Sequence, residues 1–161
     1  LNWEELQDFN CCQKTWEDSP YGREKDFYGT SNNNRNAMTT DGTARIMEEI
    51  MQNIIFDEKN INLKNCLFRQ IKEQSQDKDA NNQINGFLGE GLPQNIPFWS
   101  KAGLMSEARN DVAWWINKNQ SKTLLVVFTE GKEFANDNNF LPEFSKAIYE
   151  FIHSEKLINL P

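Results

Sequence analysis

Two basic side chains stand close together in a stretch that otherwise holds small and apolar residues. Lys101 is followed by Ala102 and Gly103 in a segment that alternates as a strand does, and Arg109 opens the next apolar run. A lysine in such a strand either extends into water from an edge or serves a site, and the strand alone leaves both interpretations open. Gly103 would allow a ligand to approach the backbone closely. The short turn between the segments predicts that Arg109 lies one turn away from Lys101.

This ordered set of residues resembles the class A β-lactamases and the penicillin-binding serine acyl-transferases. Lys101-Ala102-Gly103 is similar to their Lys-Thr/Ser-Gly strand, and residues 109–113 are similar to the strand that returns from it. The segments 91–93 and 124–129 match the flanks of that family in order and approximate spacing. A Lys-x-Gly triplet by itself would carry no weight, so the resemblance depends on the ordered set.

The resemblance implies a role for each residue of the stretch. Lys101 would lie near the nucleophile and raise the positive potential around an anionic substrate. The backbone N–H of Leu104 would complete an oxyanion hole. The substrate would contact Ala102, Gly103 and Arg109. The planar guanidinium of Arg109 would bind a substrate carboxylate with two parallel hydrogen bonds, which a lysine ammonium cannot do. Ala102 departs from the family pattern, because the Thr or Ser expected there donates a hydroxyl to that carboxylate.

A carboxylate that could activate water is predicted near the N-terminus. Glu24 precedes Thr39 by about fifteen residues, the spacing at which the family places its deacylating glutamate before a Thr-Thr helix start. A buried carboxylate with a raised pKa suits that task. The alternative is that residues 23–26 form a solvated run of charges, and Glu17 and Asp18 are further candidates.

The family's nucleophile motif, Ser-x-x-Lys at the start of a buried helix, has no convincing match in this sequence. Ser75 and Lys78 spell the motif, but no apolar stripe anchors them and they lie downstream of the family's position. A Ser-Asp-Asn loop is absent as well. The chain begins at Leu1 and lacks the pattern of a signal peptide. We therefore expect the sequence to start inside a longer protein. We therefore expect a missing N-terminal part of the same protein to supply the nucleophile, and this chain alone to be inactive.

Composition narrows the remaining classes of function. The chain has 161 residues, of which 38% are hydrophobic, and a formal net charge of −7, so it can bury a core and is unsuited to nucleic acid. No apolar run approaches the roughly 20 residues of a membrane span. Three cysteines and a single His153 form neither a zinc spacing nor a Ser-His triad. We expect no metal and no cofactor, and the compartment stays open except that the resemblance suggests a periplasmic or secreted bacterial protein.

We predict an α+β fold that corresponds to the C-terminal part of a β-lactamase/transpeptidase-like fold. One domain would comprise an irregular Ω-loop-like region over residues 1–36, a helical segment over 37–95, and antiparallel strands with a C-terminal helix over 96–161. The predicted strands form a three-stranded meander over 96–103, 111–117 and 123–129. Both faces of the middle strand are apolar, so we expect both faces of the sheet to be covered.

Three helices are predicted around this sheet. The first starts at Thr40 as its N-cap, the second runs from Leu63 to Lys72, and the third opens at Leu141 with Phe144 and Phe151 among its inward residues.

The function expected from the motifs and the resemblance is a serine β-lactamase-like hydrolase that acts by acyl transfer on a β-lactam or a peptide-like small molecule. The alternatives are a cell-wall carboxypeptidase or amidase on the same scaffold, which the departure at residue 102 favours, and a non-catalytic binding or structural domain, which the absent nucleophile favours.

Overall fold

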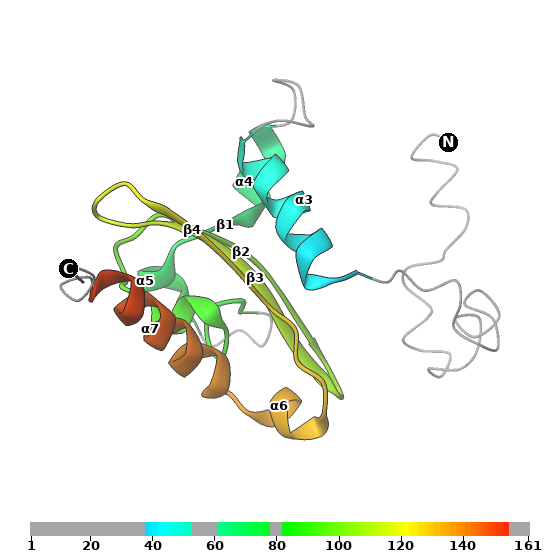
Figure 1. The fold of residues 1–161 in the computed structure, drawn as a ribbon. Coiled ribbons are helices and arrows are strands. Elements are labelled where there is room, and N and C mark those ends of the chain that lie inside the picture. The colour runs from blue at the N-terminus through cyan, green and yellow to red at the C-terminus, as the bar shows by residue number, and fades with distance from the viewer. Residues whose placement is uncertain (1–37, 53–60, 78–81, 155–161) are drawn as a thin grey trace, which may run out of the picture. The chain divides into compact units, whose positions relative to one another are not determined.

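The structure, a computed structural model, describes residues 38–52, 61–77 and 82–154 (Figure 1). The chain divides into two units, and the described residues from Thr39 onward belong to the second of them. The predicted irregular region over residues 1–36, Glu24 included, lies outside the described residues. Its assignment as an Ω-like loop therefore stays a prediction.

The fold centres on a four-stranded antiparallel sheet whose strands lie side by side in chain order. The strands are β1 (Phe68–Arg69), β2 (Phe98–Met105), β3 (Ala108–Ile116) and β4 (Lys122–Val127). Strands β2 and β3 pair along their whole length, and β4 pairs with the second half of β3. The predicted meander is confirmed. Strand β3 begins three residues earlier than predicted, because the turn before it consists of residues 106 and 107 alone.

The predicted second helix is interrupted, and the interruption adds the fourth strand. Helix α4 (Ile61–Leu67) ends before Phe68, and α5 (Ile71–Gln74) starts after Gln70. Between them, Phe68 pairs with Trp99, and their rings meet edge to face at a centroid distance of 5.5 Å. The helical spacing of the apolar residues was therefore misleading here, since pairing with a neighbouring strand outweighs local propensity.

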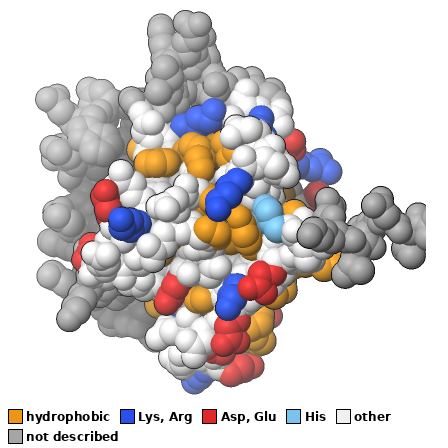
Figure 2. Space-filling view, turned by 90° about the vertical axis from the view of Figure 1, so that its left-hand side faces the viewer, with side chains coloured by type: hydrophobic (Ala, Val, Ile, Leu, Met, Phe, Trp, Pro, Cys, Tyr) orange, Lys and Arg blue, Asp and Glu red, His pale blue; other side chains and the backbone are white. Residues whose placement is uncertain are grey.

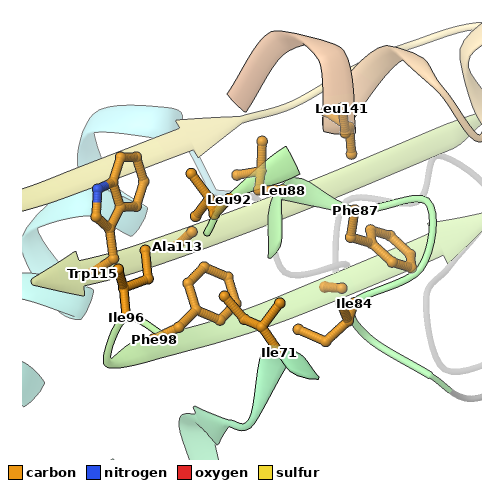
Figure 3. Packing of buried hydrophobic residues seen from close by; sticks show 11 residues of the cluster. Ile71, Ile84, Phe87, Leu88, Leu92, Ile96, Phe98, Ala113, Trp115 and Leu141 are labelled. Atoms are coloured by element: carbon orange, nitrogen blue, oxygen red, sulfur yellow. The ribbon is translucent and has the colours of Figure 1, made fainter. Parts of the chain in front are cut away.

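Two hydrophobic clusters cover the two faces of the sheet, as predicted. One face packs against the 3₁₀ turn η2 (Leu88–Gly91) and helix α7 (Phe140–His153), with Phe98, Ala113 and Trp115 contributed by the strands (Figure 3). The other face packs against α3 (Thr40–Gln52), with Val112 and Trp114 contributed by the strands. Figure 1 shows α3 and α4 on one side of the sheet and α7 on the other.

The helix ends and helix faces differ in detail from the predictions. Helix α3 is capped by Thr39 instead of Thr40, because the Thr39 Oγ1 accepts the N–H of Gly42 at 3.0 Å. Helix α7 buries Leu141 at its start, whereas the predicted inward residues Phe144 and Phe151 are 37% and 74% exposed. The face drawn in Figure 2 shows hydrophobic side chains with basic and acidic ones around them.

The turn η2 holds α7 close to the sheet. The Ser145 hydroxyl donates to the carbonyl oxygen of Leu88 at 2.7 Å. A Cβ at Gly91 would lie 2.0 Å from the carbonyl oxygen of Pro142 and 2.4 Å from the Ser145 Oγ, so the backbone contact requires glycine there. Among the described residues, no helix has both the length and the apolar character needed to cross a bilayer.

Candidate active site

The C-terminal half of strand β2 forms an open edge of the sheet. Strand β1 pairs with Phe98 and Trp99 only, so no described strand lies beside β2 from Ser100 onward. The N–H of Ala102 points to this edge, where it donates to the Gln83 Oε1 at 3.2 Å. Alternate residues of a strand direct their backbone groups to the same edge, so the N–H of Leu104 is directed there as well. This is the orientation that the predicted oxyanion role of Leu104 requires.

Lys101 and Gly103 lie on the face of the sheet that packs against α3. Lys101 is exposed and stands opposite Val112, a member of the cluster on that face. Its ammonium donates to the carbonyl oxygen of Ala102 at 2.5 Å, which brings the charge to the open edge. Gly103 is exposed, and a Cβ built on it would meet nothing within 4 Å. Packing within the described residues therefore does not require glycine at this position.

Ala102 and Arg109 lie on the opposite face, toward α7. Ala102 stands opposite Asp111, and Arg109 stands opposite Leu104. Because residues directly opposite each other share a face and successive residues alternate, Arg109 and Lys101 lie on different faces of the sheet. The sequence predicts Arg109 one turn away from Lys101, and the structure places the two side chains on opposite faces of the sheet.

The Arg109 guanidinium is buried and bonded by the chain itself. It donates to the carbonyl oxygen of Gly86 at 3.1 Å, to that of Ala135 at 3.0 and 3.3 Å, and to the Asn138 Oδ1 at 2.6 Å. Its Cζ also lies 5.1 Å from the ring centroid of Phe87. Burial lowers the pKa of Arg109 from its ordinary value, and the nearby charge of Asp137 opposes that shift. The Arg109 guanidinium is thus held by hydrogen bonds within the chain, and its contact with a substrate stays a prediction.

A buried carboxyl that the sequence analysis did not single out lies opposite Ala102. Asp111 is 1% exposed, and burial raises its pKa to about 7. Hydrogen bonds from the N–H groups of Leu88 and Val112 oppose this rise, as do the charges of Lys101 and Arg69. The Asp111 Oδ2 accepts the Leu88 N–H at 3.1 Å, whereas its Oδ1 has no hydrogen-bond partner among the described residues.

Gln83 and Arg69 also belong to the open edge, and sequence reasoning missed both. The Gln83 Oε1 that accepts the Ala102 N–H also accepts the Arg69 Nη2 at 3.3 Å. Arg69 is brought there by β1, the strand that was predicted as helix. Gln83 comes from an irregular segment whose sequence has no periodic signal that could place it beside β2.

The remaining sequence candidates do not join this edge. Ser75 follows the last turn of α5, and its Oγ donates to the carbonyl oxygen of Lys72 at 3.0 Å, so it ends a helix where the family's nucleophile would open one. Glu24 lies outside the described residues. Among the residues that the structure describes, no three His, Cys, Asp or Glu side chains are grouped so that they could hold a metal ion.

Comparison with known proteins identifies a family and solved structures of similar fold. The family described as "Beta-lactamase enzyme family" matches residues 6–152. A crystal structure of a β-lactamase from Streptosporangium roseum is similar in fold, with a TM-score of 0.56 and 18% sequence identity over 74% of this chain. The similar region is 42% of that structure, so this chain spans less than half of its length. No curated protein matches the chain.

Proposed function

The chain belongs to the β-lactamase enzyme family, and from this we propose that it contributes the sheet side of the active site of a serine hydrolase. The reaction would be acyl transfer, in which a serine attacks a lactam or amide carbonyl and water then hydrolyses the acyl-enzyme. The substrate would be a small molecule, a β-lactam or a peptide-like compound.

The observation that carries this proposal is the open edge of β2. Its backbone presents the N–H of Leu104 toward the edge, and the exposed Lys101 brings its ammonium to the carbonyl oxygen of the preceding edge residue, Ala102. A backbone N–H beside a fixed cation stabilises negative charge as it develops on a carbonyl oxygen. We assign the oxyanion role to Leu104, the electrostatic role to Lys101, and contact with the substrate backbone to Gly103.

The nucleophile and the water-activating base in this proposal come from elsewhere in the protein. The sequence has no Ser-x-x-Lys at the start of an apolar helix, and Ser75 closes a helix instead. We propose that a segment of the same protein outside these 161 residues supplies the serine and its lysine. Glu24 remains the proposed base for deacylation.

The test compares two lysines of the same sheet in the complete protein. Lys101→Ala should lower kcat/KM for a chromogenic cephalosporin by about 100-fold, the scale on which removal of one stabilising group acts. Lys122→Ala is the matched control, because Lys122 is also exposed but stands opposite Ile116, at the other end of the ladder. Equal kcat/KM values for the two variants would contradict the role of Lys101. The 161-residue chain alone should not be labelled by a fluorescent penicillin, and stoichiometric labelling would contradict an external nucleophile.

Two observations favour alternative functions. Residue 102 is an alanine, so it has no hydroxyl that could donate to a lactam carboxylate. Its methyl group is buried on the face toward α7. The missing hydroxyl favours a cell-wall carboxypeptidase or an amidase. An assay for release of the terminal amino acid from an acylated dipeptide would reveal such an activity. The lack of a matching nucleophile motif favours a non-catalytic binding domain, for which the complete protein would bind a β-lactam without turnover.

A further inference from the structure

Two polar side chains are buried directly behind the open edge of β2. Ala102 stands opposite Asp111, and the next pair along the ladder is Ser100 opposite Ala113. These four side chains share the face toward α7, and Ser100 and Asp111 are diagonal neighbours on it. Asp111 is 1% exposed and Ser100 is fully buried. The strand that carries Lys101 on its other face therefore covers a hydroxyl and a carboxyl.

One oxygen of the Asp111 carboxyl is left without a fixed hydrogen bond. The Oδ2 accepts the N–H of Leu88 at 3.1 Å, whereas the Oδ1 and the Ser100 Oγ have no partner among the described residues. A hydroxyl donates to an ionised carboxyl or accepts from a neutral one, so Ser100 suits both charge states of its neighbour. Burial disfavours the ionised form and raises the pKa of Asp111 to about 7, so this carboxyl changes its charge near neutral pH.

The charges that act on this carboxyl come from the strands beside β3. Lys101 on β2 and Arg69 on β1 both favour the ionised form of Asp111. The interaction between two charges is reciprocal, so a carboxylate at Asp111 offsets part of the positive potential of these two cations. The potential at the open edge therefore depends on whether Asp111 holds its proton.

The other charged side chains on the elements around Asp111 are exposed or bonded elsewhere. Those of η2, α6 and α7 are all exposed, and they are Glu90, Lys132, Glu133, Glu143, Lys146 and Glu150. On β3, the Arg109 guanidinium is bonded to Gly86, Ala135 and Asn138. On β4, the residue opposite Asp111 is Val127, which carries no charge. Lys101 and Arg69 are thus the cations whose potential this carboxyl alters.

We propose that Asp111 regulates the candidate active site from behind β2, because the charge of its carboxyl sets how much of the positive potential of Lys101 reaches the open edge. The neutral carboxyl leaves that potential intact, and the ionised carboxyl offsets part of it. Asp111 acts through Lys101 and is a positioning residue, since it is buried away from any substrate. The catalytic consequence rests on the proposed function, in which Lys101 stabilises negative charge on the reacting carbonyl, whereas the electrostatic coupling of the two side chains does not.

The coupling is measured on the chain itself, without a substrate. In ¹³C-labelled chain, the assigned signal of the Asp111 carboxyl carbon gives a titration midpoint by NMR between pH 5 and pH 9. Lys101→Met should raise that midpoint by about half a pH unit, because it removes a charge that favours ionisation. Lys122→Met is the matched control. Lys122 stands opposite Ile116, which lies about 17 Å along β3 from Asp111, so its charge is screened and the midpoint should stay the same.

The catalytic consequence is measured in the complete protein with a chromogenic cephalosporin. Between pH 6 and pH 8, kcat/KM should fall by about 5-fold more in the wild type than in Asp111→Asn, since only the carboxylate offsets the charge of Lys101. In a Lys101→Met background, the same comparison should give a difference of less than about 2-fold, because the charge on which Asp111 acts is gone. A loss of structure at high pH would act equally in both backgrounds, so the comparison separates regulation from unfolding.

Three results would overturn the proposal. They are an unchanged midpoint in Lys101→Met, equal midpoint shifts in Lys101→Met and Lys122→Met, or the same pH dependence of kcat/KM in the wild type and Asp111→Asn. If Asp111→Asn does not fold, the midpoints decide the matter, because they are measured with Asp111 in place. Absence of turnover at every pH would contradict the proposed function alone, and the midpoints would still show whether Asp111 and Lys101 are coupled.

Discussion

The buried carboxyl of Asp111 makes the stability of this domain depend on pH in a defined direction. The folded chain holds the proton up to a pH of about 7, whereas an unfolded chain releases it near the ordinary pKa of 3.8. Since the folded state binds the proton more tightly, the contribution to stability is complete below pH 3.8 and is lost as the pH rises through about 7. The interval spans about three pH units, and at about 1.4 kcal/mol for each unit the loss amounts to about 4 kcal/mol.

The assay is urea unfolding at pH 4 and pH 8, followed by the fluorescence of the tryptophans in the sheet. Asp111→Asn cannot ionise, so the free energy of unfolding of the wild-type chain should fall by about 4 kcal/mol more than that of the variant between these pH values. Asp41→Asn is the control, because the Asp41 side chain is 76% exposed and its ion pair among the described residues is with the equally exposed Arg45. It should follow the wild-type curve. Equal losses for wild type and Asp111→Asn would refute the reasoning.

A second substitution approaches the same carboxyl from the neighbouring strand. Ala102 and Asp111 form a pair whose backbone groups point away from each other, the kind of pair in which the side chains lie closest. In Ala102→Ser, the new hydroxyl can donate to the Asp111 Oδ1, which has no partner among the described residues. A hydrogen bond to the ionised form lowers the pKa, so this variant should be about 1.5 kcal/mol more stable than wild type at pH 8 and show no such gain at pH 4.

Two further substitutions test the packing around the edge. Gly91→Ala should destabilise the chain by about 3 kcal/mol in thermal melts, because its Cβ would lie 2.0 Å from the carbonyl oxygen of Pro142, whereas Gly103→Ala has open space and should change stability by less than about 0.5 kcal/mol. Arg109→Met should cost about 3 kcal/mol, since it leaves buried carbonyl oxygens without their donor. The exposed Arg45→Met serves as its control, and equal melting temperatures for these last two variants would contradict the structural role of the buried guanidinium.

The meander could be predicted from the sequence because its signals are local. Alternation along each strand, a short turn and apolar residues on both faces determine the pairing and the cover on both sides. Strand β1 could not be predicted this way. It has only two residues, and their extended form depends on β2, which lies far away in the chain.

The candidate site was predictable in part. The Lys101 ammonium and the backbone of Leu104 lie at the open edge, where their roles stay predictions, and the position of Arg109 depends on register. With a turn of two residues, Leu104 pairs with Arg109, so these two side chains share a face of the sheet. Lys101 lies an odd number of residues before Leu104, so its side chain is on the other face. Gln83 enters from an irregular segment, and only the folded chain brings it to the edge.

The hydroxyl of Ser145 that bonds the carbonyl oxygen of Leu88 also bears on the order in which this domain folds. The bond joins residues 57 positions apart, whereas the strands of the meander pair through turns of a few residues. Closing the long loop costs more chain entropy than closing the hairpins. We therefore expect the hairpin of β2 and β3 to form in the transition state for folding, and α7 to dock after it. Ser145→Ala should then speed unfolding and leave the folding rate nearly unchanged.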